Sequence, residues 1–278
     1  MKRMLIIILL LTSIMIFGQA QTKSKPKAKG VLLENITWVE AEKILNADTV
    51  IVIPLGAAAK EHGPHLKLKN DFLISEFLKN QTLQKADVVI APTINYHFYP
   101  AFVEYPGSTT LRLETARDMV VDICKSLSRY GVRRFYILNT GISTLRALKP
   151  AAEALAADGI LMQYTDLQKL TGGVEKEITK QEGGTHADEI ETSMMLYIAP
   201  DSVDMKKAVK DFHPSKGKLT RDPNNKEGTY SATGIWGDPT LATREKGRKI
   251  MDAMVTGILK DIEDVRHRQF PSPSSKQD

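Results

Sequence analysis

The chain has 278 residues, of which 42% are hydrophobic and 26% are charged. These proportions are typical of a soluble globular protein, and they exclude a disordered or membrane-spanning chain. The length allows one large domain with a sizeable core. The formal net charge is +5, but the basic residues form only short, scattered clusters without interleaved aromatic residues. Nucleic acid is therefore not an expected partner.

The first twenty residues have the order of a secretory signal peptide. Lys2 and Arg3 precede the apolar run MLIIILLLTSIMIF, and the small residues Gly18 and Ala20 follow it. The run is short for a membrane span. We therefore expect cleavage after Ala20, no stable membrane anchor, and export to the periplasm or out of the cell; a retained anchor is the alternative.

Four short apolar runs predict buried strands, because they are rich in Val and Ile and end in turn residues. They are TVIVIPLG (49–56), DVVIAPTI (87–94), RRFYILNT (133–140) and GILMQYTD (159–166). Amphipathic segments predict helices over 37–45, 71–83, 114–131, 144–159, 187–199 and 240–269. This alternation predicts an α/β fold, with a mostly parallel sheet flanked by helices on both faces.

Local signals indicate where several helices begin, end or bend. Thr37 with Glu40 fits a capping box at a helix start. Gly131 and Gly159 fit helix C-termini. Pro150 predicts a kink or a division of the helix over 144–159.

The chain reads as one domain with short flanking segments. After the signal peptide, residues 21–34 are expected to be a flexible lead-in and residues 269–278 a disordered tail. The domain itself is expected to span 35–268. From 167 to 240 the pattern is irregular apart from one helix, and long loops in a compact α/β protein tend to carry function.

The stretch EHGPHLKLKND (61–71) holds two histidines and two acids. It follows the strand over 49–56, at the edge where open α/β sheets bind ligands. Taken singly, a loop histidine is more often hydrogen-bonded than metal-bound, and Asp71 fits an ordinary helix cap. Together, Glu61, His62, His65 and Asp71 favour a metal site, because imidazole mixed with carboxylate suits Zn²⁺ or Mn²⁺.

A second polar cluster, GGTHADEIETS (183–193), runs from a glycine loop into a helix. It offers His186, Asp188, Glu189 and Glu191. The two glutamates are two residues apart and face different sides of the helix, so only one should share a site with His186. An acidic first turn that complements the helix dipole is the alternative interpretation.

These stretches resemble the creatininase (creatinine amidohydrolase) family. PLGAAAKEHGPHLKLKND is similar to its P-[VL]-G-x-x-E-Q-H-G-P-H-L-P-x-x-x-D block, and HADEIETS to its H-A-G-x-x-E-T-S block. YPGSTTL (105–111) is similar to F-P-G-T-x-x-L, and TGIWGDPTLATREKG to G-x-x-G-D-P-x-x-A-x-x-E-K-G. The four blocks occur in the family's order over roughly residues 35–265.

The resemblance implies a three-layer α/β sandwich, a homo-oligomer and a dinuclear metal site. It implies hydrolysis of a non-peptide C–N amide bond, often in a small cyclic substrate. By this resemblance His62 and Asp71 bind metal, with Asp71 bridging both ions, and His186 assists proton transfer. The metal would lower the pKa of a bound water and polarise the substrate carbonyl.

Two positions depart from the family pattern. Lys60 stands where the family has a ligand Glu, two residues before the first His, and Glu61 is adjacent to His62. The family's N-G-H-G-G-N segment reads NTGIST (139–144), so Gly141 replaces a metal-binding His. Lys60 would thus place an ammonium where a cation otherwise sits. A mononuclear site with three protein ligands and an open position would remain competent for catalysis.

The sequence therefore predicts an exported, metal-dependent amidohydrolase that acts on a small molecule, with one or two Zn²⁺ or Mn²⁺ ions. A non-catalytic small-molecule-binding protein that has lost its metal centre is the alternative, as is an enzyme that deformylates or trims a modified peptide. The candidate residues are Glu61, His62, Asp71 and Glu191 for metal binding, His186 and Glu189 for catalysis, and His65 and Trp236 for substrate binding.

Overall fold

The computed structural model describes residues 28–214 and 217–273. A five-stranded, wholly parallel sheet lies at its centre, in the order β1-β3-β2-β4-β5. The strands are β1 (Val31–Leu32), β2 (Val50–Leu55), β3 (Val89–Ile90), β4 (Arg134–Asn139) and β5 (Leu161–Tyr164), with a small separate pair, β6 (Leu219–Thr220) and β7 (Thr229–Tyr230).

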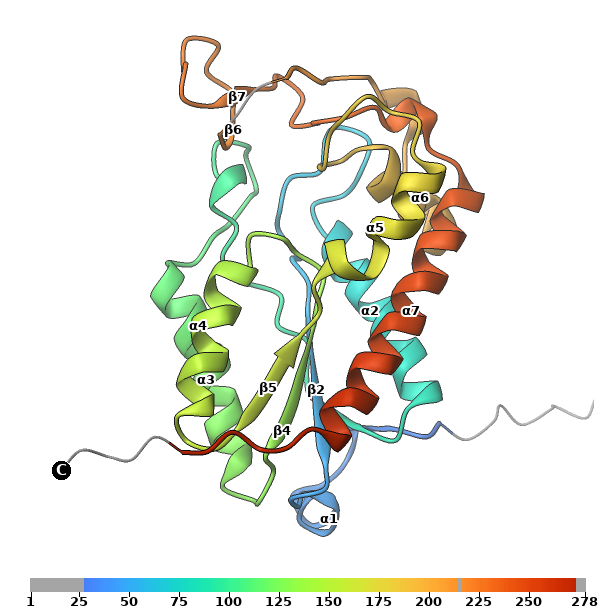
Figure 1. Ribbon diagram of the computed structural model, residues 1–278. Helices are drawn as coiled ribbons and strands as arrows, with labels where there is room; N and C mark the ends of the chain where they lie inside the picture. The colour runs from blue at the N-terminus through green and yellow to red at the C-terminus, as the bar shows by residue number, and fades with distance from the viewer. Residues whose placement is uncertain (1–27, 215–216, 274–278) are drawn as a thin grey trace, which may run out of the picture.

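Helices cover both faces of the sheet and complete three layers. They are α1 (Trp38–Ile44), α2 (Asn70–Lys85), α3 (Leu113–Ser128), α4 (Leu145–Ala156), α5 (Leu167–Ile178), α6 (Glu189–Ile198) and α7 (Arg244–His267). In Figure 1, α3 and α4 lie on one side of the sheet, and α2 and α7 lie on the other. The α/β architecture expected from the alternation of strands and helices is confirmed.

Strand β2 shows how the core is divided between the two faces of the sheet. All six of its residues are buried, and successive side chains point to opposite faces. Val50 and Val52 pack in the cluster formed with α2, α6 and α7. Ile51 and Ile53 pack in the cluster formed with α3 and α4. The continuous apolar run is therefore explained by burial on both faces.

The direction in which the strands are added to the sheet changes between β2 and β4. The chain leaves β2 through α2 to reach β3 on one side, whereas β4 leads through α4 to β5 on the other. Ligands of open α/β sheets bind outside the carboxyl ends of the strands where the order diverges in this way. The loop after β2 and the loop after β4 meet at this point.

Most of the expected helix signals are confirmed, with one correction. Thr37 and Glu40 form the capping box at the start of α1. Gly131 and Gly159, with φ of +95° and +71°, each lie in the turn that follows a helix, after α3 and α4 respectively. The expected division at Pro150 is wrong, because α4 runs as one helix from Leu145 to Ala156. Buried side chains on both sides of Pro150 hold the helix against the sheet.

Three segments are more ordered than the sequence indicated. The lead-in expected over 21–34 is described from residue 28, and there β1 pairs with β3 at the edge of the sheet. Helix α5 lies in the region expected to be irregular; its apolar residues pack on the core, but Gly172 and Gly173 obscure its period. At the expected tail, the Arg134 guanidinium lies 4.0 Å from the centre of the Phe270 ring.

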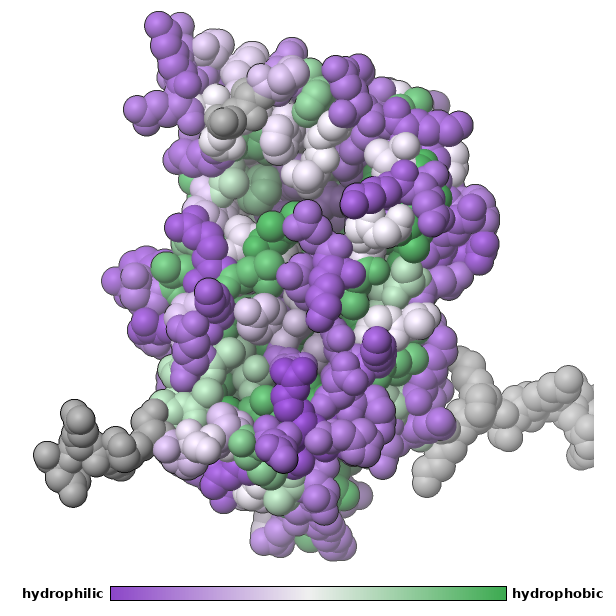
Figure 2. All heavy atoms as spheres, in the orientation of Figure 1, coloured by the Kyte–Doolittle hydropathy of each residue, from purple (hydrophilic) through white to green (hydrophobic). Residues whose placement is uncertain are grey.

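The expected signal peptide, residues 1–20, lies outside the described residues. Among the residues that the structure describes, none of the helices is both long enough and apolar enough to cross a membrane. On the face seen in Figure 2, hydrophobic side chains gather between α4 and α5, and hydrophilic side chains cover most of the remainder.

His97, in the loop after β3, gives folding stability a dependence on pH. The residue is fully buried, and burial lowers the pKa of its imidazole from 6.5 to about 4. The folded state thus prefers the neutral ring, so this contribution is complete above pH 6.5 and is lost as the pH falls toward 4. We expect the wild type to lose up to about 3 kcal/mol over this interval relative to His97→Phe.

Urea denaturation of both proteins at several pH values between 4 and 7 measures the difference. His97→Phe should show a flatter dependence of unfolding free energy on pH than the wild type. Equal slopes for the two proteins would contradict a buried neutral imidazole at this position.

Candidate functional site

The loop after β2 is held in place by the YPGSTTL segment. The backbone N–H of Glu61 donates to Ser108 Oγ at 2.9 Å, and Thr109 N donates to the carbonyl of Ala59 at 2.9 Å. Lys60 N donates to the carbonyl of Leu68 and closes the loop on itself. These contacts explain why two sequence blocks more than forty residues apart belong to one site.

Asp71, in the first turn of α2, lies between two nitrogen donors. Its Oδ1 is 2.8 Å from His62 Nε2, and its Oδ2 is 2.7 Å from the ammonium of Lys60. The other ring nitrogen of His62, Nδ1, lies 3.0 Å from the carbonyl oxygen of Lys60. Both nitrogens of this imidazole therefore face oxygen atoms, and all three residues are almost completely buried.

His186 lies across from this group and also faces oxygen atoms with both nitrogens. Its Nε2 is 3.0 Å from Glu61 Oε2, and its Nδ1 is 3.6 Å from Glu191 Oε2. The backbone of His186 is paired with that of Trp236 in an isolated antiparallel bridge. The imidazole also packs on Phe102, with ring centres 4.3 Å apart.

His62, His186 and Glu191 form the tightest group of potential metal ligands. One ligand atom from each lies within 4.8 Å of the other two, and the two rings have centres 5.0 Å apart. We call these three residues the triad. Two imidazoles and one carboxylate are the donor set of catalytic zinc sites that keep an open position.

The charges around the triad also fit a divalent cation. Glu61, Asp71 and Glu191 supply three carboxylates, and Lys60 supplies one ammonium. With neutral imidazoles two negative charges remain, and buried charge of this kind is costly unless it is neutralised. Either a divalent ion or protons on both imidazoles would balance it.

At three buried groups of the site, neighbouring charges outweigh the effect of burial on the pKa. Burial alone would lower the pKa of Lys60, but Asp71, Glu191 and Glu61 outweigh it and the pKa is raised. Burial alone would raise the pKa of Asp71, but Lys60 and His62 hold it below its usual range. Burial is likewise outweighed at His186, whose pKa is raised by Glu61 and Glu191.

The structure separates the two glutamates of the second cluster, as their spacing predicted. Glu191 faces His186, and its Oε2 also accepts from Ala187 N at 2.6 Å. Glu189 is fully buried on the other side of α6 and is paired with Lys246. Its Oε2 accepts from the backbone N–H of Lys180 and Gln181. The catalytic role expected for Glu189 does not agree with this position, because its oxygens are engaged away from the triad.

The remaining candidates contact the site from its edge. Glu61 and Asp71, expected as ligands, lie outside the triad and each contacts one of its histidines. His65, expected to bind substrate, is buried with Nε2 at 2.8 Å from Thr192 Oγ1, and burial lowers its pKa to about 4. The Trp236 indole stacks on Phe212 and donates to the His213 carbonyl.

The loop after β4, which carries Gly141, contacts the site. The Thr140 hydroxyl donates to the carbonyls of Leu55 and Asp71, so this loop contacts the start of α2. A Cβ at Gly141 would lie 3.0 Å from Thr144 Cγ2 and 3.5 Å from the Tyr99 ring. The Thr144 and Tyr99 side chains therefore pack close to Gly141, and this position offers no side-chain ligand.

Sequence reasoning missed the aromatic side of the site. The rings of Phe102 and Tyr99 lie 4.8 Å and 5.8 Å from the Lys60 ammonium. The available signal was the aromatic run HFYPAF (97–102), which directly follows a strand and its turn. Aromatic residues in such a position are consistent with lining a site at the sheet edge.

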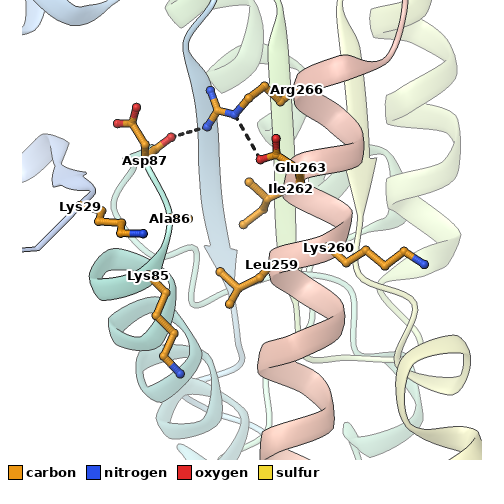
Figure 3. Close-up of a pocket in the computed structure, with 9 residues that line it drawn as sticks. All are labelled: Lys29, Lys85, Ala86, Asp87, Leu259, Lys260, Ile262, Glu263 and Arg266. Atoms are coloured by element: carbon orange, nitrogen blue, oxygen red, sulfur yellow. Dashed lines mark hydrogen bonds and ion pairs between the residues drawn. The ribbon is translucent and has the colours of Figure 1, made fainter.

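A cavity of about 510 Å³ adjoins the triad at the carboxyl ends of β4 and β5. Glu191 and Gly141 line it and connect it to the triad, and α5 contributes Thr171 and Glu175 from one face. Its volume is that of a small-molecule site. A second hollow, of about 600 Å³, lies between the C-terminal ends of α2 and α7 (Figure 3), at the opposite end of the sheet.

The fold and the site together define an α/β protein with a buried histidine–carboxylate centre at the carboxyl edge of a parallel sheet. The family model for creatininase, described as creatinine amidohydrolase, matches residues 34–262. The creatinine amidohydrolase of Pseudomonas putida is 26% identical over 266 residues, 88% of this chain and 99% of the relative. The mycofactocin precursor peptide peptidase of Mycolicibacterium smegmatis is 27% identical over 220 residues, 77% of this chain and 84% of the relative.

Solved structures agree with these matches. A crystal structure of creatinine amidohydrolase (creatininase) has a TM-score of 0.73 at 25% identity, covering 87% of this chain and 100% of that chain. A creatininase mutant described as Zn-Zn type has a TM-score of 0.72 at 25% identity, with the same coverage. The chain belongs to the creatininase family. Its relatives named here are hydrolases, and the family places it among enzymes that hydrolyse carbon–nitrogen bonds.

Proposed function

We propose that this protein is an exported, metal-dependent hydrolase that cleaves a C–N amide bond of a small molecule. The observation that carries the proposal is the triad of His62, His186 and Glu191, buried at the carboxyl edge of the sheet in a creatininase-family chain. Export is supported by the signal-peptide pattern of residues 1–20. A homo-oligomer is supported by the family resemblance.

The triad would hold Zn²⁺ or Mn²⁺, and the solved relative described as Zn-Zn type supports zinc. A divalent ion in such a site lowers the pKa of bound water and polarises a carbonyl oxygen. Glu61 orients the His186 ring through Nε2, at 3.0 Å, in the way that carboxylates orient ligand histidines. This carboxylate also lies where it can accept a proton and return it to a leaving amine.

The cavity beside the triad is proposed to receive the substrate. Asp166, Glu175, Asp188 and Glu191 line it, and among the residues that the structure describes its lining contains neither Lys nor Arg. Within the described residues, none of these four carboxylates forms an ion pair with Lys or Arg. A cleft lined by charges of one sign attracts the opposite sign. We therefore propose that the substrate is positively charged rather than anionic.

A matched set of ligands tests this preference. The Nα-acetyl amides of lysine, norleucine and glutamate differ in side-chain charge, and their binding to the metal-loaded protein can be measured by calorimetry. The lysine compound should bind at least about tenfold more tightly than the norleucine compound. Glu175→Gln should reduce that difference, whereas Glu177→Gln, an exposed α5 residue outside the cavity lining, should not. Equal binding of all three compounds would contradict the charge preference.

A non-catalytic binding protein is a second candidate, and two observations favour it. Gly141 offers no side-chain ligand, and the Lys60 ammonium lies against Asp71 inside the centre. The test is hydrolysis of a panel of small amides before and after treatment with a chelator. Turnover that chelation removes and Zn²⁺ or Mn²⁺ restores supports the enzyme. Binding without turnover, unaffected by the chelator, supports the binding protein.

A further inference from the structure

The ammonium of Lys60 is a positive charge held in a fixed position inside the candidate metal centre. The side chain is 6% exposed, and Nζ lies 2.7 Å from Asp71 Oδ2. The rings of Phe102 and Tyr99 flank the same nitrogen at 4.8 Å and 5.8 Å. Carboxylate and aromatic faces both attract a cation, so these three neighbours hold the ammonium in place.

This position of Lys60 leaves Asp71 unable to join two metal ions. A carboxylate that bridges two ions must offer an oxygen to each of them. Here Oδ2 faces Lys60 and Oδ1 faces His62 Nε2 at 2.8 Å. The only oxygen of Asp71 directed at the triad is therefore Oδ1.

The charge balance of the centre leads to the same result. The centre contains three carboxylates, that of Glu191 in the triad and those of Glu61 and Asp71 beside it, and Lys60 neutralises one of them. Among the described residues, no other Lys or Arg forms an ion pair with any of the three. Histidines that bind a metal are neutral, so the two remaining negative charges match one divalent ion and do not match two.

We propose that the Lys60 ammonium takes the place of a second metal ion, so that the centre binds one divalent ion per chain. This inference rests on the metal-dependent function proposed above. It assigns Lys60 as a positioning residue, which acts on the centre through Asp71.

The number of bound ions tests the proposal directly. The protein, without residues 1–20, is loaded with excess Zn²⁺, desalted and measured by native and elemental mass spectrometry. The wild type should carry one ion. Lys60→Glu leaves four negative charges and frees Asp71 Oδ2, and should carry two. Lys79→Glu is the matched control, because Lys79, on α2, is buried and ion-paired as Lys60 is. This variant should carry one ion.

A second variant keeps the test valid if Lys60→Glu does not fold, and circular dichroism checks the folding of both variants. Lys60→Met removes the ammonium without adding a carboxylate, and it should bind a second Zn²⁺ at least tenfold more tightly than the wild type does. The role of Lys60 is overturned if the wild type carries two ions, or if the folded Lys60 variants bind Zn²⁺ as the wild type does. A wild type that binds no ion would instead overturn the proposed metal-dependent function.

Discussion

Replacing His62 with Ala is expected to remove the bound metal ion and to reduce amide hydrolysis by about 10³-fold or more. His62 supplies one of only three donors in the triad, and two donors hold a catalytic divalent ion poorly. The substitution also removes the partner of Asp71 Oδ1. His186→Ala should have the same consequences, because it removes the opposite donor and the partner of Glu61.

The measurement combines metal content with hydrolysis of the small-amide panel. His267→Ala serves as the control, because His267 is exposed on α7 and contacts Glu263; it should retain both metal and activity. If His62→Ala kept its metal and its rate, the centre would have to lie elsewhere in the chain. If metal were lost but hydrolysis persisted, the reaction would not depend on the triad.

Replacing Gly247 with Ala is expected to lower the free energy of unfolding by about 3 kcal/mol, which is the upper part of the usual range for overpacking. Gly247 lies in the first turns of α7, where that helix packs directly on α6. A Cβ at this position would overlap the backbone carbonyl of Ser193. Because backbone atoms cannot rotate away as a side chain can, the two helices would have to separate.

Separation of the helices should also displace Glu191 of the triad, because α6 carries this residue. We therefore expect Gly247→Ala to bind Zn²⁺ more weakly as well as to unfold at lower urea concentration. Gly173→Ala is the matched control, since a Cβ there meets no atom within 4 Å. In the interior of α5 it should stabilise the protein by about 0.5–1 kcal/mol. Similar unfolding curves for the two variants would contradict the close packing of α6 on α7.

The sequence by itself determined the layers of this protein and the location of its site. Strand and helix periods are local properties, so the runs over 49–56 and 133–140 predicted β2 and β4 with small errors at their ends. The position of EHGPH directly after a strand predicted that it lies at the ligand-binding edge. Helix α5 was missed because Gly172 and Gly173 weaken its pattern, although Leu170 and Val174 keep its apolar face.

Only the tertiary structure decided which polar residues meet. Glu189 and Glu191 lie two residues apart, yet one pairs with Lys246 and the other faces His186. Glu61 meets a histidine 125 positions away. Such pairings depend on how the loops after β2 and β4 and the start of α6 converge, which local periodicity does not encode. The same convergence aligns Lys60 with Asp71, and it thereby fixes the charge of the centre.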